Sequence, residues 1–302
     1  MNKEKQPSKR VLISFDYAFK RLLRNKANYD VLEGFLSELL KEDIQVKSIG
    51  ESESNKENKE DKYNKVDILV EDKRGEILLI ELQFTLELDY LHRMLYGVSK
   101  AISERMSHGK KYIDIKKIYS INIVYFDLGQ GDDYVYYGKT EFKGLHTHNN
   151  LQLTKLQQET FKKETVSDIY PEYYILKVDS FDNKAKSKLD EWIYFFKNNE
   201  IKEEFTARGL KKAKEVLDYD KLTAEEKRDY DHLLRIRQGN TSSLHSAKDT
   251  GRAEGIELGK ELGMESVVVE SFKNGLSNEI ISAITKLSKE EIVSILKKKE
   301  LI

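Results

Sequence analysis

The sequence has no cysteine, and only two prolines and one tryptophan among its 302 residues. Without cysteine, a disulfide scaffold, a thiol nucleophile and a Cys-ligated zinc site are excluded. No run of about 18 apolar residues occurs, so no segment is predicted to span a membrane. The basic N-terminus, MNKEKQPSKR, lacks the apolar stretch and the cleavage site of a signal peptide. We therefore expect a soluble, cytoplasmic protein with no membrane partner.

An excess of charge of one sign is also missing, since 52 Lys+Arg stand against 53 Asp+Glu. This balance excludes a uniformly basic coat for nucleic acid and a globally acidic, solvating chain. Charged residues nevertheless make up 35% of the chain, well above the usual quarter, and apolar residues make up 39%. Such a composition predicts a packed core under a heavily charged surface.

Hydrophobic periodicity predicts an ordered series of helices and strands over the first 200 residues. Helices are expected at 15–25, 28–42, 89–107 and 186–199, and strands at 44–50, 64–72, 76–87, 117–128, 133–142 and 172–181. The expected apolar stripe of the third helix comprises Leu91, Met94, Leu95, Val98, Ile102 and Met106. This order indicates a mixed α/β domain over residues 1–200.

Residues 201–302 are predicted to form a second, helical region with a polar break around Gly239–Ser243. Gly251, Gly255, Gly259 and Gly263 recur at a four-residue interval. In a helix they would form a smooth stripe for close approach of another helix, which favours self-association; otherwise they belong to a weakly ordered linker. Two short helices follow, with Ser277 and Ser288 as N-caps and Glu291 completing a capping box. This end resembles half of a helix-turn-helix, but it has no basic recognition helix, so we favour oligomer packing or docking.

The segment from 64 to 87 predicts a hairpin, because two aliphatic runs flank the short turn Lys73–Gly75. A three-residue loop with Gly75 in the left-handed conformation is a common connection. That register places Asp67 directly opposite Glu81. A shift by one residue would put the two carboxylates on opposite faces instead.

Glu81 follows four aliphatic residues, Ile77 to Ile80, in a strand that we expect to be buried on both faces. Two carboxylates facing each other repel unless a cation lies between them. Mg²⁺ is held by one or two carboxylates together with water and substrate phosphates, so the pair suits metal-assisted phosphodiester hydrolysis. The alternative is that both side chains simply face solvent.

The order of motifs FDYAFKRLL, KVDILVED, ILLIELQ, HRMLYGVSKAISERM and KKIYSINIVYFDL resembles the Rpn family. These bacterial proteins are recombination-promoting nucleases, or PD-(D/E)XK nuclease family transposases, and the resemblance covers essentially the whole chain. It implies a restriction-endonuclease-like fold, with a mixed central sheet flanked by helices, and Mg²⁺-dependent DNA cleavage (Ca²⁺ or Mn²⁺ are alternative ions).

The resemblance also implies roles for single residues. Asp67 and Glu81 fall on the acidic positions of the motif and would bind the metal, with the backbone carbonyl of Leu82 as a further ligand. Gln83 falls on the last catalytic position, where Lys is usual. A lysine stabilises a nascent hydroxide by its charge, whereas glutamine can only hydrogen-bond and position it.

Supporting residues have two interpretations each. Glu33 matches an additional carboxylate of related nucleases, or is a solvated helix residue. Asp16 and Lys20 match the recurrent Asp and Lys of FDYAFK and reach the site, or they form an i,i+4 pair. Arg93, Tyr96 and Lys100 share one stripe of their helix; like Lys20 they would contact substrate phosphates, or they form a solvated face.

Two functions follow as hypotheses. The first is a metal-dependent DNA endonuclease linked to recombination, mobile elements or phage defence, a context taken wholly from the resemblance. The second is a catalytically weak or inactive DNA-binding or oligomeric interaction protein on a nuclease scaffold, which the missing lysine favours.

The local charge distribution fits the first hypothesis. Residues 1–30 carry eight basic and three acidic residues, and 92–117 carry seven and two, so each segment has a net charge of +5. Residues 31–91 carry eight and sixteen, a net charge of −8. A metal site flanked by phosphate-binding segments is expected to show this pattern.

Overall fold

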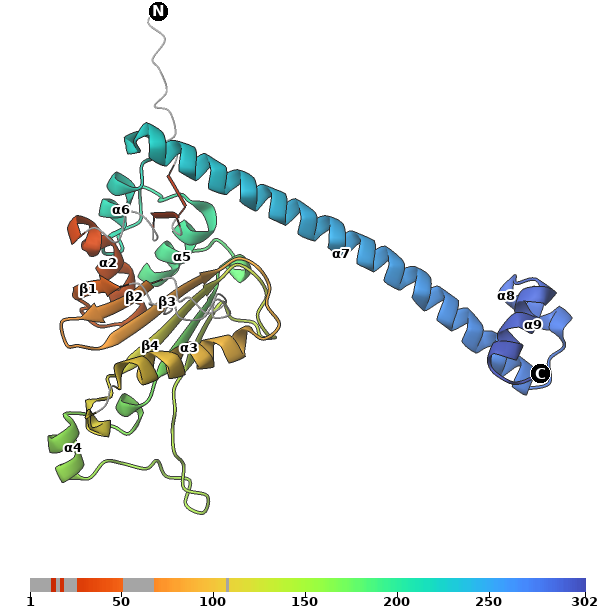
Figure 1. Cartoon of the computed structure of the whole chain (residues 1–302), viewed down its shortest axis with the longest axis horizontal. Helices are drawn as coiled ribbons and strands as arrows, with labels where there is room; N and C mark the ends of the chain where they lie inside the picture. The colour runs from red at the N-terminus through yellow and green to blue at the C-terminus, as the bar shows by residue number, and fades with distance from the viewer. Residues whose placement is uncertain (1–11, 15–16, 19–25, 51–67, 107–108) are drawn as a thin grey trace, which may run out of the picture. The chain divides into compact units, whose positions relative to one another are not determined.

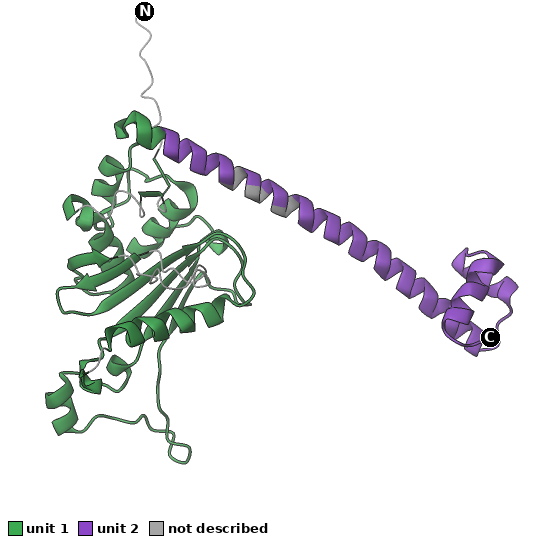
Figure 2. Cartoon of the chain, in the orientation of Figure 1, with its two compact units in different colours: residues 1–227 green, residues 228–302 purple. Residues whose placement is uncertain are grey.

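The computed structural model describes residues 12–14, 17–18, 26–50, 68–106 and 109–302 (Figure 1). The chain forms two compact units, residues 1–227 and 228–302 (Figure 2). The predicted boundary at residue 200 thus lies inside the first unit. In the part of the chain that the structure describes, no helix is both long and apolar enough to cross a membrane.

The first unit contains a mixed six-stranded sheet and the helices that flank it. Its strands are β1 (Val46–Gly50), β2 (Ile68–Asp72), β3 (Ile77–Gln83), β4 (Ile118–Val124), β5 (Val135–Gly138) and β6 (Glu172–Lys177). Its α-helices are α2 (Tyr29–Leu40), α3 (Tyr90–Arg105), α4 (Lys155–Phe161), α5 (Lys188–Asn198) and α6 (Leu210–Val216). Short 3-10 helices are η1 (Lys26–Asn28), η3 (Tyr112–Asp114), η4 (Ser167–Ile169), η5 (Val178–Ser180) and η6 (Tyr219–Lys221).

The strand order of the sheet is β1-β2-β3-β4-β6-β5. Strands β1, β2 and β3 form an antiparallel meander, β3, β4 and β6 are parallel, and β5 is antiparallel to β6. Helix α3 lies on one face, whereas α2, α5 and α6 lie on the other (Figure 1). The predicted mixed α/β fold with flanking helices is confirmed.

The β2–β3 hairpin has the predicted three-residue turn. Gly75 adopts a φ of 80°, and its N–H donates to the carbonyl of Asp72 at 2.9 Å. The buried carboxylate of Asp72 also accepts from the backbone N–H groups of Arg74 (2.9 Å) and Glu76 (2.8 Å). The resulting register pairs Ile68 with Ile80. The predicted register is therefore confirmed over the residues that the structure describes in both strands.

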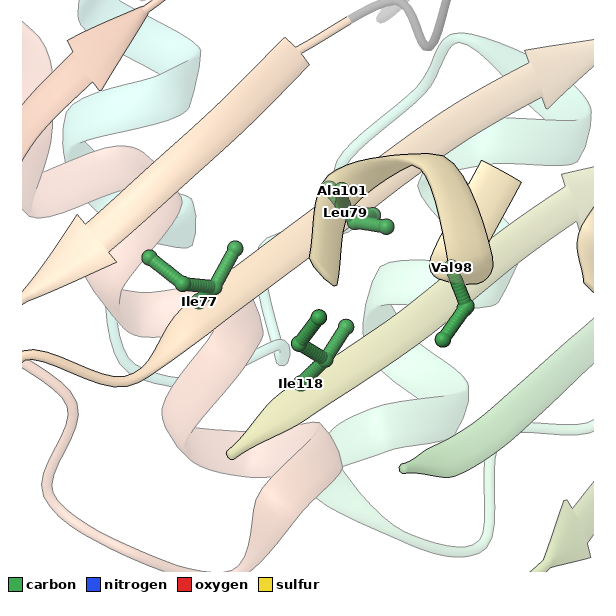
Figure 3. Close-up of a cluster of buried hydrophobic side chains, with 5 residues drawn as sticks. All are labelled: Ile77, Leu79, Val98, Ala101 and Ile118. Carbon is green, nitrogen blue, oxygen red and sulfur yellow. The ribbon is translucent and has the colours of Figure 1, made fainter. Parts of the chain in front are cut away.

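Helix α3 packs an apolar face onto β3 and β4. Figure 3 shows Val98 and Ala101 of the helix beside Ile77, Leu79 and Ile118 of the strands. These five side chains are at most 5% exposed. Their burial removes apolar surface from water and holds the second half of α3 against the sheet.

The predicted apolar stripe of α3 is wrong at two positions. Leu91 and Leu95 are 53% and 58% exposed, whereas Tyr90 and Ala101 are buried with Met94 and Val98. A periodicity of 3.6 residues defines the stripe only to within a residue on either side, and the sheet selects the face that contains the tyrosine.

On the other face, α2 meets the turn that precedes α6 at very close range. A Cβ atom on Gly34 would lie 2.2 Å from the carbonyl oxygen of Arg208 and 2.8 Å from Cα of Gly209. Gly209 has a φ of +83° and is itself close to the backbone of α2. Two glycines placed back to back thus allow the backbones to pack without side chains between them.

We expect Gly34→Ala to destabilise the first unit by about 1–3 kcal/mol, because the new methyl group overlaps backbone atoms that cannot move alone. Chemical denaturation followed by near-ultraviolet circular dichroism measures this change. Gly50→Ala is the matched control, since a Cβ at Gly50 meets nothing within 4 Å. Equal stability of the two variants would contradict the close packing.

The second unit consists of most of α7 (Ala224–Lys273) with α8 (Asn278–Thr285) and α9 (Lys289–Lys298). Ser277 and Ser288 are the N-caps of the two short helices, as predicted, and Ser288 and Glu291 form the capping box. The unit has its own small core, which comprises Val268, Ile281, Ile292 and Leu296.

Helix α7 continues through Gly239–Ser243, so the predicted polar break is wrong. Glycine costs a helix about 1 kcal/mol relative to alanine, the Asn, Thr and Ser residues of this stretch cost less, and the stretch contains no proline, so α7 can continue through it. The four periodic glycines also lie within α7, and a Cβ at any of them would meet nothing within 4 Å. Of the two interpretations of these glycines, the structure shows the helical one.

Candidate active site

The sheet face under α3 changes from apolar to polar along β3. Alternate residues of a strand share a face, so Ile77, Leu79, Glu81 and Gln83 all lie on the side that α3 covers. The parallel register places Asn122 of β4 beside Glu81. The second half of α3 thus packs on aliphatic side chains, whereas its first turns lie over carboxylate and amide groups.

Glu81 is a buried carboxylate, with only 7% of the residue exposed. Burial of a carboxylate is unfavourable unless positive charge and hydrogen bonds compensate it. The guanidinium group of Arg93, from the first turns of α3, makes an ion pair with Oε1 of Glu81. The structure therefore brings together two of the residues that the sequence singled out.

Arg93 is shared between two carboxylates. Its Nη1 donates to Oε1 and Oε2 of Glu87, both at 2.9 Å. Burial, the largest effect, lowers the pKa of Arg93, but the carboxylates of Glu81 and Glu87 outweigh it and raise that pKa above the ordinary value. Arg93 is therefore a fixed positive charge at this end of β3.

Gln83 joins this cluster by a hydrogen bond to Glu87. Its Nε2 donates to Oε1 of Glu87 at 2.7 Å and to the carbonyl of Thr85 at 3.2 Å. Sequence reasoning missed Glu87, which lies in the connection between β3 and α3 and belongs to no recognisable spacing. A carboxylate six residues after Glu81 and six before Arg93 was the only available signal.

A buried hydrogen-bond network fixes the first turn of α3 on the sheet. The hydroxyl of Tyr90 donates to Oδ1 of Asn122 at 3.2 Å, and Nδ2 of Asn122 donates to Oγ of Ser120 at 3.0 Å and to the carbonyl of Tyr174 at 3.3 Å. The guanidinium carbon of Arg93 is 6.0 Å from the centre of the Tyr90 ring. Sequence reasoning also missed the pair of Tyr90 and Asn122, although the asparagine in the apolar run SINIV was a usable signal.

Comparison with protein families identifies the family of the chain. A model of the PD-(D/E)XK nuclease family transposases matches residues 13–247. The chain belongs to this family. Membership makes it a nuclease-family protein, for which DNA is the implied substrate and a divalent metal ion the usual cofactor. No curated protein and no solved structure matches the chain.

Of the three residues that the resemblance assigns to the catalytic motif, Glu81 and Gln83 lie within the described ranges and Asp67 does not. Asp67, Asp16 and Lys20 all lie outside the described residues. Within the described ranges, no group of three or more His, Cys, Asp and Glu side chains is arranged to hold a metal ion. The pair next to Asp67 in the hairpin, Ile68 with Ile80, is in the predicted register.

Glu33 is not brought to Glu81. Its Oε1 accepts from the backbone N–H of Val46 at 2.8 Å, and Val46 pairs with Asp72 at the turn of the hairpin. Glu81 lies at the far end of β3 from that turn. In this structure Glu33 therefore connects α2 to the first strand.

Tyr96 and Lys100 follow Arg93 along α3 without joining its contacts. Tyr96 is 46% exposed. Nζ of Lys100 is 4.0 Å from the carboxylate of Glu104, one helical turn away. Of the predicted stripe, only Arg93 contacts the carboxylate cluster among the residues described.

Proposed function

We propose that this protein is a metal-dependent DNA endonuclease that hydrolyses phosphodiester bonds. The observation that carries the proposal is Glu81, buried on β3 with Arg93 as its counter-charge and Gln83 two residues on. A carboxylate in this position is costly for folding alone, which is typical of a residue kept for chemistry. Family membership supports the same reaction class.

The donor set fits a hard divalent cation such as Mg²⁺, with Ca²⁺ or Mn²⁺ as alternatives. The ligands that the resemblance implies are two carboxylates and a backbone carbonyl, so all of the donor atoms are oxygens, which such an ion prefers. We propose that Asp67, Glu81 and the carbonyl of Leu82 hold the ion. The described hairpin register supports this set, because continuing it by one pair from Ile68 and Ile80 sets Asp67 opposite Glu81. A bound ion would stabilise the developing negative charge and lower the pKa of water.

The residues of α3 would provide the contacts to DNA. Arg93 is held at the carboxylate cluster by Glu87, where a guanidinium group can bind the phosphate next to the scissile bond. Tyr96 and Lys100 lie further along the same helix, and we propose that they contact the backbone beyond it. Lys20 is the remaining phosphate ligand that we propose from the resemblance.

Plasmid nicking tests the proposal. The purified protein is expected to convert supercoiled plasmid to nicked circles with Mg²⁺ and to stop on addition of EDTA. Asp67→Ala should abolish the reaction, because it removes one of the two proposed carboxylate ligands. Glu71→Ala is the matched control, since Glu71 lies four residues after Asp67 in the sequence and its carboxylate pairs with the exposed Lys47. Equal cleavage by Asp67→Ala and the parent would refute the assigned site.

A second candidate is a DNA-binding or oligomeric protein with weak or no cleavage on the same scaffold. The specific observation in its favour is Gln83, which replaces the usual cationic lysine and is bound to Glu87. This candidate predicts that the protein binds DNA in a salt-dependent way and that plasmid nicking yields no metal-dependent product. The Rpn context of recombination, mobile elements or phage defence applies to both candidates and rests on the resemblance alone.

We also propose that the C-terminal helices mediate homo-oligomerisation. The periodic glycines of α7 lie on a helix surface where Leu258, Leu262 and Ile256 are each more than half exposed. Burial of such side chains against a second copy would remove apolar surface from water. The small glycines would let the two helices approach closely.

A further inference from the structure

The hydrogen bonds of Gln83 determine which atom of its amide group is available to a ligand. Nε2 lies 2.7 Å from a carboxylate oxygen of Glu87 and 3.2 Å from the carbonyl oxygen of Thr85. Both neighbours accept hydrogen bonds and neither donates them. The reverse orientation of the amide would set its oxygen against two other oxygens, so the NH₂ group must face them.

Both N–H groups of Gln83 are thus used within the protein. The amide oxygen is directed away from Glu87 and Thr85, and no group in the described ranges donates a hydrogen bond to it. The usual lysine of the family motif presents only donors and a positive charge at this position. Gln83 instead presents an acceptor, which is the opposite polarity.

Glu87 is itself held in place. Both of its carboxylate oxygens accept from Nη1 of Arg93 at 2.9 Å, while Nη2 of the same guanidinium contacts Glu81. Two-thirds of the Glu87 side chain is buried, since 33% is exposed. The contacts therefore run in series from Glu81 through Arg93 and Glu87 to Gln83. This series links the orientation of the Gln83 amide to Glu81, the proposed metal ligand.

We infer that Gln83 acts through its amide oxygen, which accepts a hydrogen bond from the attacking water, and that Glu87 is the positioning residue for this orientation. An acceptor that holds one hydrogen of the water directs its lone pair toward the phosphorus atom. Gln83 takes no proton itself; the proton that the water loses on attack passes to a phosphate oxygen or to solvent as the bond from phosphorus to the leaving oxygen breaks. The inference rests on the proposed nuclease function and assigns the role that the replaced lysine leaves open.

Two variants separate an acceptor from a donor at this position. The exchange Gln83→Glu/Glu87→Gln conserves the net charge and the hydrogen bond between positions 83 and 87, with donor and acceptor swapped, loses the hydrogen bond to Thr85, and keeps an oxygen at position 83. Gln83→Lys supplies donors only and pairs with Glu87. We expect Gln83→Lys to nick plasmid about 10-fold to 100-fold more slowly than the parent, because it misplaces the water, and the exchange variant to be faster than Gln83→Lys. If the lysine variant is as fast as the parent, or the exchange variant is no faster than the lysine variant, the inference is wrong.

Nuclear magnetic resonance of protein labelled with ¹⁵N-glutamine gives a readout that does not depend on cleavage. The side-chain NH₂ signals of Gln83, assigned by their loss in Gln83→Glu, should lie downfield in the parent and move upfield in Glu87→Gln. Glu104→Gln is the control, because Glu104 lies on α3 and pairs with Lys100, and this variant should leave the Gln83 signals unchanged. Signals that do not respond to Glu87→Gln would refute the positioning role. A parent protein without cleavage would refute the proposed function instead, so the two failures are distinguishable.

Discussion

Glu81→Gln is expected to reduce metal-dependent cleavage at least about 100-fold while the protein remains folded. The amide has nearly the same shape and its oxygen can still accept from Arg93, but it lacks the negative charge that holds a divalent cation. A 100-fold loss corresponds to about 2.7 kcal/mol of transition-state stabilisation. Initial rates of plasmid nicking at several Mg²⁺ concentrations give the change in rate, and titration calorimetry with Mn²⁺ or Ca²⁺ gives the change in ion affinity.

The control for this prediction lies on the neighbouring strand. Glu71 of β2 makes an exposed pair with Lys47, so Glu71→Gln removes a carboxylate without touching the cluster around Arg93. Exposed pairs contribute roughly 0–1 kcal/mol, so its stability and cleavage should match the parent. Loss of ion affinity in Glu71→Gln to the same degree as in Glu81→Gln would show that general charge, rather than the site, attracts the ion.

Trp192→Ala is expected to destabilise the first unit by about 3–5 kcal/mol. The side chain is fully buried, with ring centres 5.8 Å from Phe35, 5.9 Å from Phe196 and 6.2 Å from Phe195. Its Nε1 also donates to the carbonyl of Arg208 at 3.2 Å. The substitution therefore leaves a large cavity and an unsatisfied carbonyl at the contact of α2 with α5. This loss is a large part of the stability of a typical domain.

The measurement must not use tryptophan fluorescence, because Trp192 is the only tryptophan of the chain. Urea unfolding followed by near-ultraviolet circular dichroism reports on the many packed tyrosine and phenylalanine rings of the first unit. Tyr112→Ala is the matched control, since that aromatic ring is 89% exposed and its removal should change stability by less than about 0.5 kcal/mol. A midpoint for Trp192→Ala equal to that of the control would show that the aromatic cluster does not hold this unit together.

Local signals were sufficient wherever neighbouring residues decide the conformation. Gly75 predicted the hairpin turn and its register because a positive φ is nearly free of cost only for glycine. Ser288 and Glu291 predicted the start of α9 because a capping box satisfies its bonds within four residues. The same box at Thr154 and Gln157 was overlooked, and with it helix α4.

Predictions that depended on packing were less accurate. Leu91 and Leu95 were placed in the core because apolar periodicity gives the spacing of a stripe, not its exact rotation. The polar stretch Gly239–Ser243 was predicted to be a break in the helical region, although α7 continues through it. Intrinsic propensity differs by less than about 1 kcal/mol per residue, which is too little to set a helix end without a cap or proline.

The sequence by itself determined the family, the mixed α/β fold and the two motif residues Glu81 and Gln83 on one strand, since motif order and the two-residue period of a strand are local properties. Only the tertiary structure decided what surrounds them. A strand, a connection and a helix meet there. Arg93 of α3 contacts Glu81 of β3 and Glu87 of the connection, and Glu87 in turn contacts Gln83 of β3. No spacing encodes these contacts, because they arise when packing of α3 on the sheet brings separate segments to one point. The chain lacks cysteine, and this packing places Glu81, Arg93, Glu87 and Gln83 in one charged cluster.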